Sequence, residues 1–413
     1  MLTSTDVLVL GAGMVGTCTA LQLARRGHSV TLVDRKPPGQ ETSFGNAGII
    51  QREAVEPYAF PREWSAVFDV AFKRGIDVNY HLATLPLVLP HLARYWRASA
   101  SSSYALIARD YSRLIEHCLT EHDVLIAESG ASDLVRKDGY RFAFRTQAAM
   151  DIAAARAAEL QHRYGVRHHL LDGNGLAHAE PGLRTRLAGA VHWTDPWSVS
   201  DPGELVQRYA KRCAELGGRV VRGDASTLEA SGSGWRVKSD SGWVSARQAV
   251  VALGPWAGGL TRSLGYRLPL FVKRGYHRHY RGGPGLRMPL LDAERGLVLA
   301  PMAAGLRLTT GAEFALIGAS PTPVQLTKAE RAARELIDLP DPVEAQPWLG
   351  NRPCTVDMKP VIGPAPHHPN LWFNFGHAHQ GFTLGPVSGR LIAEMIGAAT
   401  TCVDPAPYAA TRF

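Results

Sequence analysis

Two patterns of apolar residues alternate at the start of the chain. Residues 7–10 are an unbroken apolar run, which is typical of a strand buried on both faces. The residues that follow, up to about Arg26, carry apolar side chains at helical spacing, and Gly27 ends this predicted helix. A second apolar run reaches Asp34. The order of strand, helix and strand predicts one βαβ unit of a parallel sheet.

In the middle of the chain the apolar pattern is first mainly helical and then returns to that of strands. Residues from about 55 to 186 are largely helical in their spacing, most clearly at 106–126 and 148–164, and an alternating segment at 139–145 predicts a strand. A further helix is predicted at 202–216. The pattern then returns to strands, at 219–222, 235–238, 243–246 and 248–254. We interpret the middle two of these as a hairpin and the last as a buried strand.

The next segment predicts a second sheet. Its strands are expected to be antiparallel and to lie at 268–280, 296–301 and 306–310. Thr327 and Glu330 then have the spacing of a capping box, so a helix is predicted to start there.

The segment from Gly350 onward combines an arginine, a strand and a helix start. Arg352 lies just before a tight Thr-Val-Asp turn, and a short strand, LWFNF, follows at 371–375. A glycine-rich approach then leads into a helix that begins near Gly385 or Pro386. The N-terminus of a helix presents unpaired N–H groups and a partial positive charge, so this helix start suits a group that acquires negative charge.

These patterns predict an α/β fold with two interleaved domains. A Rossmann-like domain is assigned to residues 1–60, 190–265 and 345–413. An α+β domain built on an antiparallel sheet is assigned to residues 61–189 and 266–344, and we interpret it as a substrate or cap domain.

A glycine motif follows the first predicted strand and indicates a dinucleotide site. Gly11, Gly13 and Gly16 allow a tight turn, close approach of the backbone to a pyrophosphate, and close packing of helix on strand. Asp34 lies at the distance expected for hydrogen bonds to an adenosine ribose. The acid argues against a 2′-phosphate, but it does not distinguish NAD from FAD. The small-residue loop at 41–50 is either a contact to a long cofactor or an ordinary surface loop.

Composition and charge restrict the partners. With 413 residues, 45% hydrophobic and 20% charged, the chain has the composition of an ordinary globular protein. Its net charge of +8 and pI near 9.3 permit anionic partners, but the basic residues are scattered in runs no longer than a pair. Nucleic-acid binders concentrate their charge, so no nucleic-acid partner is expected.

The cysteines and the apolar stretches indicate a cytoplasmic protein. The five cysteines, Cys18, Cys118, Cys213, Cys354 and Cys402, lie far apart and include no CxxC pair, so neither a zinc site nor a disulfide framework is expected. A strand so near the start predicts that there is no signal peptide. The most apolar stretch, at 81–90, is short and contains Pro86 and Pro90, so no membrane-spanning helix is expected.

Six motifs together carry a resemblance to a known family. They are GAGMVG with Asp34, TSFGNAGII, VVALGPWA, the RGYH at 274–277, GNRPCTVDMKPVIG and GHAHQGFTLGPVSG. In this order they resemble the D-amino acid oxidase-like flavoprotein superfamily, and within it the bacterial D-amino acid dehydrogenases. RGYH with the last motif is similar to the branch that includes D-hydroxyproline dehydrogenases. The resemblance implies FAD, held in the Rossmann-like domain, and oxidation of an amine at the carbon that bears it.

The resemblance also implies the cofactor contacts. They are Gly11, Gly13, Met14, Val15, Gly16, Asp34, Arg35, Thr42, Ser43, Asn46, Ala47, Gly48, Gly254, Trp256, Arg352, Gly381, Phe382, Thr383 and Leu384. Backbone amides of the last four would lie near the flavin carbonyls. Some relatives attach FAD through a cysteine near the RPxT turn, but Arg352 rather than Cys354 fills that place in the motif, which implies non-covalent FAD.

Five residues are candidates for the chemistry. Arg352 is the first choice to bind a substrate carboxylate, because a planar guanidinium forms two charge-assisted bonds, although pairing with Asp357 is an alternative. Arg274 and Tyr276 alternate on a predicted strand and could clamp the carboxylate from one face, or serve as a surface arginine and a core tyrosine.

The remaining two candidates are His377 and His379, which flank the glycine-rich turn before the last helix. One of them could accept the ammonium proton of the substrate, because histidine titrates near neutral pH. The alternative is that each satisfies backbone groups. No carboxylate shares their spacing, so no metal site is expected.

We therefore expect FAD-dependent oxidation of a D-amino acid by hydride transfer from the α-carbon to flavin N5, with a cyclic imino acid such as D-proline or D-hydroxyproline as one candidate. Electrons would leave to a quinone or to oxygen, and a quinone implies peripheral contact with the inner membrane. The alternatives are oxidation of an N-methyl amine or a 2-hydroxy acid, a tRNA-modifying flavoenzyme, and a flavin-binding protein without catalysis.

Overall fold

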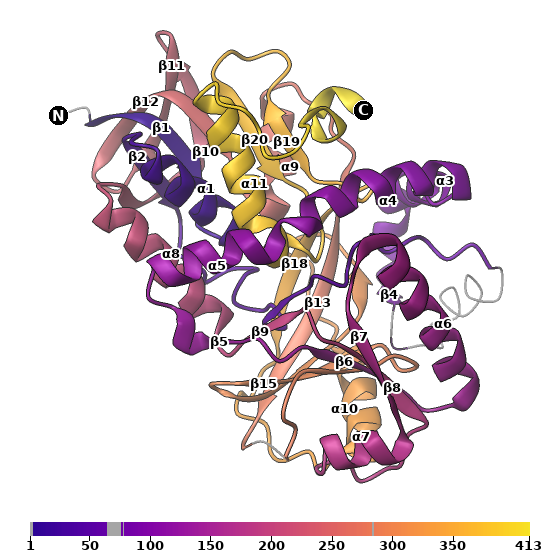
Figure 1. Cartoon of the computed structure of the whole chain (residues 1–413). Helices are drawn as coiled ribbons and strands as arrows, with labels where there is room; N and C mark the ends of the chain where they lie inside the picture. The colour runs from indigo at the N-terminus through magenta and orange to yellow at the C-terminus, as the bar shows by residue number, and fades with distance from the viewer. Residues whose placement is uncertain (1–2, 64–75, 77, 283–284) are drawn as a thin grey trace.

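Two large sheets organise the chain, and each is assembled from segments that lie far apart in the sequence (Figure 1). The structure is a computed structural model, and it describes residues 3–63, 76, 78–282 and 285–413. Its α-helices are α1 (Met14–Arg25), α3 (Leu85–Ala98), α4 (Ser101–Glu116), α5 (Cys118–Glu128), α6 (Gln147–Tyr164), α7 (Gly173–Ala179), α8 (Pro202–Glu215), α9 (Ala257–Ser263), α10 (Val324–Leu336) and α11 (Gly381–Ile396). Short 3₁₀ turns, η1 to η5, lie at Leu82–Thr84, Ser132–Leu134, Gly254–Trp256, Ala406–Tyr408 and Ala410–Arg412.

The first sheet has a parallel core. Its parallel strands, in order, are β10 (Arg219–Ser231), β2 (Val30–Asp34), β1 (Thr3–Leu10), β12 (Gly242–Val251) and β20 (Leu371–Phe375). β19 (Val361–Pro364) pairs antiparallel with β20, and β11 (Gly234–Ser239) pairs antiparallel with β10 and β12. The predicted β1–α1–β2 unit is confirmed. The strands expected at 243–246 and 248–254 form a single strand, β12.

Helices α1, α8 and α11 cover one face of this sheet, and α5 packs against α8 and α11 (Figure 1). Their apolar residues, among them Leu21, Val206 and Leu391, are fully buried in one cluster with Val7 and Val9 of β1. On the opposite face, α9 and the end of the chain pack over the sheet, and a second apolar cluster forms there. Burial on both faces explains why β1 and β12 are nearly continuous apolar runs.

Two glycines let α11 lie directly against α1. A Cβ on Gly385 would lie 2.6 Å from Cγ of Met14, and one on Gly389 would lie 2.8 Å from backbone atoms of Cys18 and Thr19. The contact advances four residues along both helices, so the two helices run in the same direction. Their N-termini therefore lie at the same end of the layer.

The second sheet is mainly antiparallel, as expected. Its strands, in order, are β4 (Val78–Tyr80), β17 (Ala312–Phe314), β13 (Leu270–Tyr280), β16 (Gly305–Thr309), β15 (Leu297–Met302), β14 (Leu290–Asp292), β6 (Tyr140–Phe144), β8 (Gly189–Trp193) and β7 (His168–Asp172), and β18 (Trp348–Thr355) also pairs with β13. Only the β14–β6 and β17–β4 pairs are parallel among the described strands of this sheet. Helices α7 and α10 bury an apolar cluster against it.

A small sheet of β3 (Ile49–Ile50), β9 (Trp197–Val199) and β5 (Val135–Arg136) joins the loop after β2 to segments of the middle of the chain. Among the described residues, none of the helices is long and apolar enough to cross a bilayer.

Several predicted boundaries differ from the structure. The helix expected to begin at a capping box of Thr327 and Glu330 begins instead at Val324, because α10 has already completed a turn there. The last helix begins at Gly381, about one turn before the predicted start at Gly385 or Pro386. The segment 55–186 is less helical than predicted, since it also supplies β4 to β7, and its residues 64–75 and 77 lie outside the described residues.

Two predicted domain boundaries also differ from the strand pairing. Our division puts residues 190–193 and 348–355 in the Rossmann-like domain, whereas β8 and β18 pair with strands of the second sheet. A buried strand has the same pattern in either sheet, so only its non-local partner distinguishes the two.

Pro386 lies inside α11 without breaking it, and His122 explains why. Proline has no N–H, so the carbonyl of Phe382, one turn earlier, lacks its helical donor. Nε2 of the buried His122 lies 2.9 Å from that carbonyl oxygen and supplies the missing hydrogen bond. Burial lowers the pKa of His122 to about 4, so the ring is neutral and its Nδ1 can accept from the Tyr209 hydroxyl at 3.3 Å.

We predict that His122→Leu destabilises the protein by about 1–3 kcal/mol, because it leaves the buried Phe382 carbonyl without a donor. Pro386→Ala in the same chain should recover part of this loss, because the alanine restores an N–H one turn after Phe382. Chemical denaturation of both single variants and the double variant measures the coupling. Equal destabilisation with and without Pro386 would contradict this account.

Candidate active site

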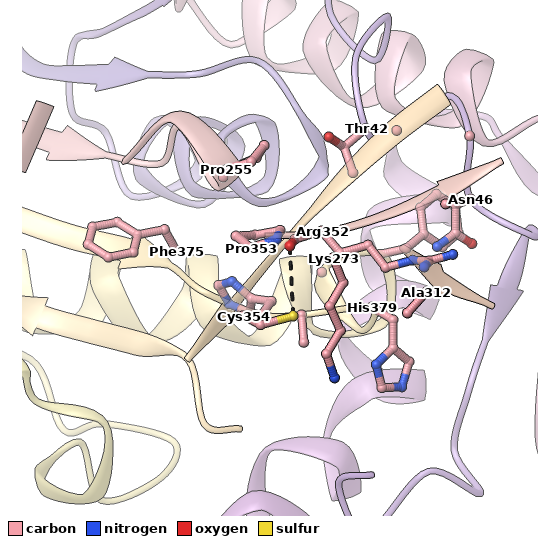
Figure 2. Close-up of a pocket in the computed structure, with 18 of the residues that line it drawn as sticks. Thr42, Asn46, Pro255, Lys273, Ala312, Arg352, Pro353, Cys354, Phe375 and His379 are labelled. Carbon is pink, nitrogen blue, oxygen red and sulfur yellow. Dashed lines mark hydrogen bonds between the residues drawn. The ribbon is translucent and has the colours of Figure 1, made fainter. Parts of the chain in front are cut away.

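A cavity of about 1180 Å³ lies between the two sheets. Its wall comes from the end of β1, the loop after β2, the start of α11, and strands β13 and β18 (Figure 2). Pockets for drug-sized ligands enclose roughly 300–1,000 Å³. This cavity is larger, so it has room for a dinucleotide and a small molecule beside it.

The end of β1 forms a cradle of backbone groups. Gly11 adopts φ +104°, and a Cβ there would lie 2.5 Å from the Ala252 carbonyl oxygen, so this turn requires glycine. The Ala12 N–H donates to Oδ2 of Asp34 at 2.6 Å, and the Met14 N–H donates to Oγ of Ser43 at 2.9 Å. These bonds hold the glycine turn, the acid and the next loop together along one wall.

The far end of this wall is aromatic and basic. The Arg35 guanidinium lies 4.2 Å from the centroid of a Trp256 ring and pairs with Glu41 at 2.8 Å. Both Arg35 and Trp256 line the cavity, next to Gly254. A flat ring group could stack in this part of the cavity.

The loop at 42–48 is fixed between the two sheets, so it is not an ordinary surface loop. The Thr42 hydroxyl donates to the Asn351 carbonyl at 3.0 Å, and Oδ1 of Asn46 accepts the Gly48 N–H at 2.8 Å. From the second sheet, the buried Arg307 donates to the Phe44 carbonyl at 2.9 Å. Of the loop residues predicted to contact cofactor, Thr42, Ser43, Asn46 and Ala47 line the cavity.

The N-terminus of α11 reaches the opposite wall. Gly381 and Phe382 line the cavity, and the N-cap residue Gln380 places no side-chain bond on the helix end. Thr383 and Leu384 lie behind this wall: the Thr383 hydroxyl accepts the Gln51 N–H at 3.1 Å, and Leu384 is fully buried in the core. The positive helix end is therefore directed at the cavity through residues 381 and 382.

Other predicted cofactor contacts lie just outside the wall. Gly16 packs against Gly11, where a Cβ would lie 1.8 Å from the Gly11 carbonyl oxygen, and Gly48 packs against the Val199 carbonyl. These two glycines shape the wall without lining it. The remaining predicted contacts, namely Gly11, Gly13, Met14, Val15, Asp34, Arg35, Gly254, Trp256 and Arg352, all line the cavity.

Two buried polar atoms of the wall lack a hydrogen-bond partner within the described part of the chain. They are Oδ1 of Asn374 and Nε2 of His377, and both residues are buried and line the cavity. Buried polar groups are normally satisfied. Together with the glycine cradle and the helix end, these atoms fit a polar, elongated cofactor such as FAD.

The register of β13 decides which of its residues face the cavity. Phe271, Lys273 and Gly275 line it, and Lys273 lies directly opposite Arg352 of β18. The Arg352 side chain passes over Gly275, where a Cβ would lie 2.3 Å from NH2. Its guanidinium donates to the Gly311 carbonyl at 3.0 Å, so it is anchored at the cavity wall.

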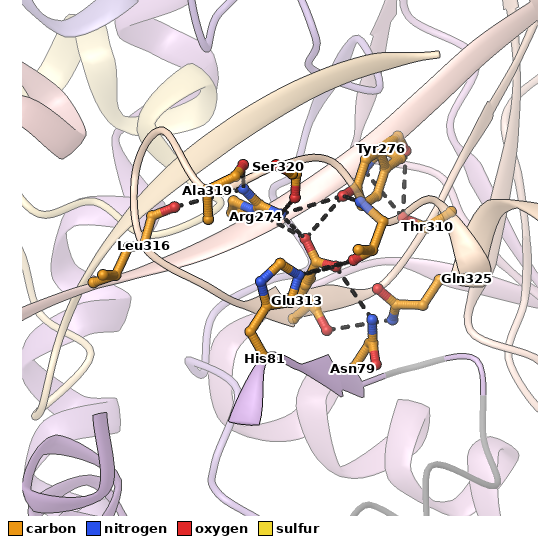
Figure 3. A network of polar contacts seen from close by, with 12 residues as sticks. Asn79, His81, Arg274, Tyr276, Thr310, Glu313, Leu316, Ala319, Ser320 and Gln325 are labelled. Atoms are coloured by element: carbon orange, nitrogen blue, oxygen red, sulfur yellow. Dashed lines mark hydrogen bonds and ion pairs between the residues drawn. The ribbon is translucent and has the colours of Figure 1, made fainter. Parts of the chain in front are cut away.

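Arg274 points to the other face of β13, which corrects its predicted role. Its Nε donates to the buried Glu313 at 2.8 Å, its NH1 donates to the Ala319 carbonyl at 2.5 Å, and NH2 donates to Glu313 and Ser320 (Figure 3). The Tyr276 hydroxyl also donates to Glu313, at 2.9 Å. Arg274 is therefore held in an internal ion pair and is not directed to clamp a substrate, whereas Tyr276 bonds to the same carboxylate and also borders the cavity.

The alternative partner predicted for Arg352 is also excluded. Asp357 pairs instead with Arg412, at 2.7 Å. Arg352 therefore reaches the cavity with backbone carbonyls as its hydrogen-bond partners.

His377 and His379 line the cavity as predicted, but their basicity is low. The pKa of each imidazole is lowered to about 3, by burial for His377 and by burial together with the charges of Arg352 and Lys273 for His379. A general base works best when its pKa lies near the working pH. These neutral rings are therefore poor acceptors for an ammonium proton, which argues against that predicted role. The His379 ring lies 4.8 Å from the ring of Tyr58.

Sequence reasoning missed Lys273. Its Nζ lies 4.6 Å from the ring centroid of Tyr95, and the rings of Phe271 and Phe314 are the next nearest. The signal was present in the alternation of Phe271, Lys273 and Gly275, which share one face of the strand. The motif RGYH drew the prediction to the residues on the other face.

A family model described as FAD dependent oxidoreductase matches residues 6–395 of this chain. The chain belongs to the DAO family of FAD-dependent oxidoreductases. It is 30% identical to a D-amino-acid oxidase of Bradyrhizobium diazoefficiens over 98% of both proteins. It is 32% identical to a D-amino acid dehydrogenase of Cereibacter sphaeroides, over 98% of this chain and 95% of that protein.

A solved structure supports the fold of this DAO-family chain. The crystal structure of glycine oxidase from Geobacillus kaustophilus matches it with a TM-score of 0.75 at 22% identity, and covers 100% of this chain and 99% of that one. The protein is therefore an FAD-dependent oxidoreductase, as its motifs predicted, and the cavity is the place where its residues fit that cofactor.

A buried acid lies behind the α11 end of the cavity. The side chain of Gln51 links the two, because its Nε2 donates to Glu53 at 2.9 Å and its Oε1 accepts from Gln380 at 2.8 Å. Glu53 is 5% exposed, and its other oxygen has no partner among the described residues. Burial raises the pKa of the Glu53 carboxyl from its usual 4.5 to about 7, more than its bond to Gln51 lowers it.

From the raised pKa of Glu53 we predict that the free energy of unfolding decreases as pH rises. Between about pH 4.5 and 7 the folded state holds a proton on Glu53 that the unfolded chain has released, so the free energy of unfolding falls through that window. The contribution at pH 8, relative to pH 4, is a loss of roughly 3 kcal/mol. Glu53→Gln should remove it. Denaturation of both proteins at several pH values measures the slopes, and equal slopes would refute the assignment.

Proposed function

We propose that the protein oxidises a D-amino acid at its α-carbon, with FAD held non-covalently in the cavity. The observation that carries this proposal is the half-buried Arg352, whose guanidinium lies at the cavity wall with backbone carbonyls as its partners. A charge in that position suits the carboxylate of an amino acid. The carbon that bears the amine loses its hydrogen and two electrons, and the resulting imine is hydrolysed by water to a 2-oxo acid and ammonia.

The residues that would hold FAD lie at both ends of the cavity. The turn from Gly11 to Met14 would receive the pyrophosphate, and Asp34 the adenosine ribose. The start of α11 at Gly381 would lie at the flavin ring. When bound, FAD supplies the acceptor for the hydrogen and the two electrons.

The cysteine near the RPxT turn supports non-covalent binding. Cys354 lines the cavity, but burial raises the pKa of its thiol above the usual value, despite the opposing effect of Lys273. A neutral thiol is a poor nucleophile. We therefore propose that FAD is held by contacts and not by a bond to sulfur.

Arg352 is proposed to orient the substrate. A guanidinium binds a carboxylate through two charge-assisted hydrogen bonds, and such bonds gain strength where water is excluded. The aromatic side chains of Tyr58, Phe271 and Phe314 line the same cavity and make part of its wall apolar. One fixed carboxylate then leaves the α-carbon with few orientations.

The same cations also favour the reactive form of the amine. Arg352 and Lys273 both lie in the cavity wall, and like charges nearby lower the pKa of an ammonium group. The substrate amine would therefore lose its proton to solvent more readily at this site. This effect replaces the histidine base that the sequence suggested.

The preference for a D-amino acid rests on the two curated relatives, which are named as acting on D-amino acids. A cyclic substrate such as D-proline or D-hydroxyproline rests only on the resemblance carried by RGYH and GHAHQGFTLGPVSG. The structure adds no support from RGYH, because Arg274 pairs with Glu313 and His277 stacks on Trp348. A wide cavity admits such a ring without selecting it.

Anaerobic titration of the flavin spectrum tests the proposal. We expect bleaching by D-amino acids and not by their L counterparts, in a panel with D-alanine, D-methionine, D-proline and both 4-hydroxy-D-prolines. Sarcosine and a D-2-hydroxy acid serve as the competing classes. Bleaching by sarcosine or the hydroxy acid alone, or by nothing while FAD is bound, would refute the D-amino acid assignment.

Arg352→Lys and Arg352→Met should lower kcat/KM by about 10²-fold or more, with Met the more severe, since each removes a charge-assisted bidentate contact. Arg184→Met is a matched control, because its guanidinium is exposed and pairs with the exposed Asp338.

We further propose that the acceptor is a membrane quinone, reached through a leucine patch that contacts an anionic bilayer. We use the name leucine patch for the exposed apolar side chains of this segment, which are Leu82, Leu87, Leu89, Trp96 and Leu106 on η1, α3 and α4. Leu89 is 53% exposed and also lines the cavity, so the patch adjoins the site. The exposed Arg94 and Arg97 of α3 supply positive charge for anionic lipid.

Sedimentation with lipid vesicles tests the patch. We expect binding to vesicles that contain phosphatidylglycerol, weaker binding to phosphatidylcholine alone, and loss of binding in the Leu82→Glu/Leu87→Glu variant. Ile152→Glu on α6 is the matched control, since Ile152 is 73% exposed and Leu82 72%. Equal binding by both variants would contradict the patch, and rapid turnover with oxygen without vesicles would favour an oxidase.

A further inference from the structure

Two cations are cross-strand neighbours on the wall of the cavity. Lys273 of β13 and Arg352 of β18 are direct cross-strand partners, and both line the cavity. Side chains in such positions share one face of the sheet, with Cβ atoms roughly 4.5–5.5 Å apart, and like charges there destabilise the sheet. In the described part of the chain, no carboxylate forms an ion pair with either of them.

The contrast with the neighbouring residue is sharp. On the opposite face of the same strand, Arg274 is neutralised by the buried Glu313 at 2.5 Å. A buried charge normally requires such a partner. The cavity face therefore holds positive charge that the protein itself leaves uncompensated.

The two cations point away from each other. Figure 2 shows their side chains extending in different directions. The Arg352 guanidinium lies over Gly275 and is anchored to the Gly311 carbonyl, while the Lys273 ammonium lies nearest the rings of Tyr95 and Phe271. The guanidinium is thus held toward Gly275 and the ammonium toward the aromatic rings, so the two charged groups offer two anion positions.

The surroundings of Lys273 make a nearby anion favourable. The ammonium lies among aromatic rings, which attract a cation through their faces but supply no negative charge. Burial lowers the pKa of Lys273, and Arg352 lowers it further. A carboxylate beside Lys273 would reverse both effects, and the aromatic walls suit the methylene groups that lead to it.

We propose that Lys273 binds a second carboxylate of the substrate, so that this site prefers an acidic D-amino acid of the D-glutamate type. This inference rests on the proposed function, because the α-carboxylate is bound at Arg352 and the side-chain carboxylate extends to Lys273. Lys273 then determines specificity, and the chemistry at the α-carbon is unchanged.

The decisive comparison is between D-glutamate and D-glutamine, which have nearly the same shape and differ in charge. We expect wild-type kcat/KM to be at least about tenfold higher for D-glutamate. Lys273→Met should lower the value for D-glutamate by about 10–100-fold and leave D-glutamine nearly unchanged. Lys273→Glu should shift the preference toward D-lysine, and Lys211→Met, an exposed lysine on α8, is the matched control.

The outcomes separate this inference from the proposed function. If D-methionine and D-alanine reduce the flavin but D-glutamate is no better than D-glutamine, the second-carboxylate assignment fails and the proposed function stands. If Lys273→Met lowers all D-amino acids equally, Lys273 serves the α-carboxylate or the cofactor, and the assignment also fails. If no amino acid reduces bound FAD, the proposed function itself fails.

Discussion

The close, parallel packing of α11 on α1 is the constraint on which the site depends. Gly385 and Gly389 remove the side chains that would hold the helices apart, and they bring together elements from opposite ends of the sequence. Because the helices run in the same direction, the positive ends of both meet one cavity. The glycine turn before α1 and the turn before α11 are thus fixed relative to each other. Without this contact, the two turns that would hold the ends of a long cofactor would not be fixed relative to each other.

The two faces of strand β13 have different roles: one forms an internal ion-pair network and the other lines the cavity. One face carries Arg274, whose charge is neutralised by Glu313 and whose remaining N–H groups donate to backbone carbonyls. Such a network is costly to break, since loss of one partner leaves a buried charge. The other face carries Lys273 and receives Arg352 from β18. The rigid face keeps the strand in register, and the register keeps the two cations on the cavity wall.

The sequence predicted the local parts of this arrangement and missed the non-local ones. The glycine motif, Asp34 and the loop at 42–48 were found because each has a local signature, and most of their residues line the cavity together. Arg274 was assigned to the cavity wrongly, because alternation defines two faces of β13 without saying which side chains reach the cavity. The start of α11 was placed too late: the helix already begins at Gly381, and it accommodates Pro386 through a hydrogen bond from His122, a residue far away in the sequence.

The charge of the cavity wall at neutral pH does not depend on groups that change their protonation state in that range. His377 and His379 have a pKa of about 3 and stay neutral at physiological pH, while Arg352 keeps its charge because the pKa of arginine is very high. Two helix ends add partial positive charge that no proton can remove. The wall is therefore positive at neutral pH, and its charge comes from Arg352 and the two helix ends, which do not titrate near neutrality. A site of this kind attracts a carboxylate, disfavours an ammonium, and stabilises negative charge on an electron acceptor, which are the three requirements of amine oxidation.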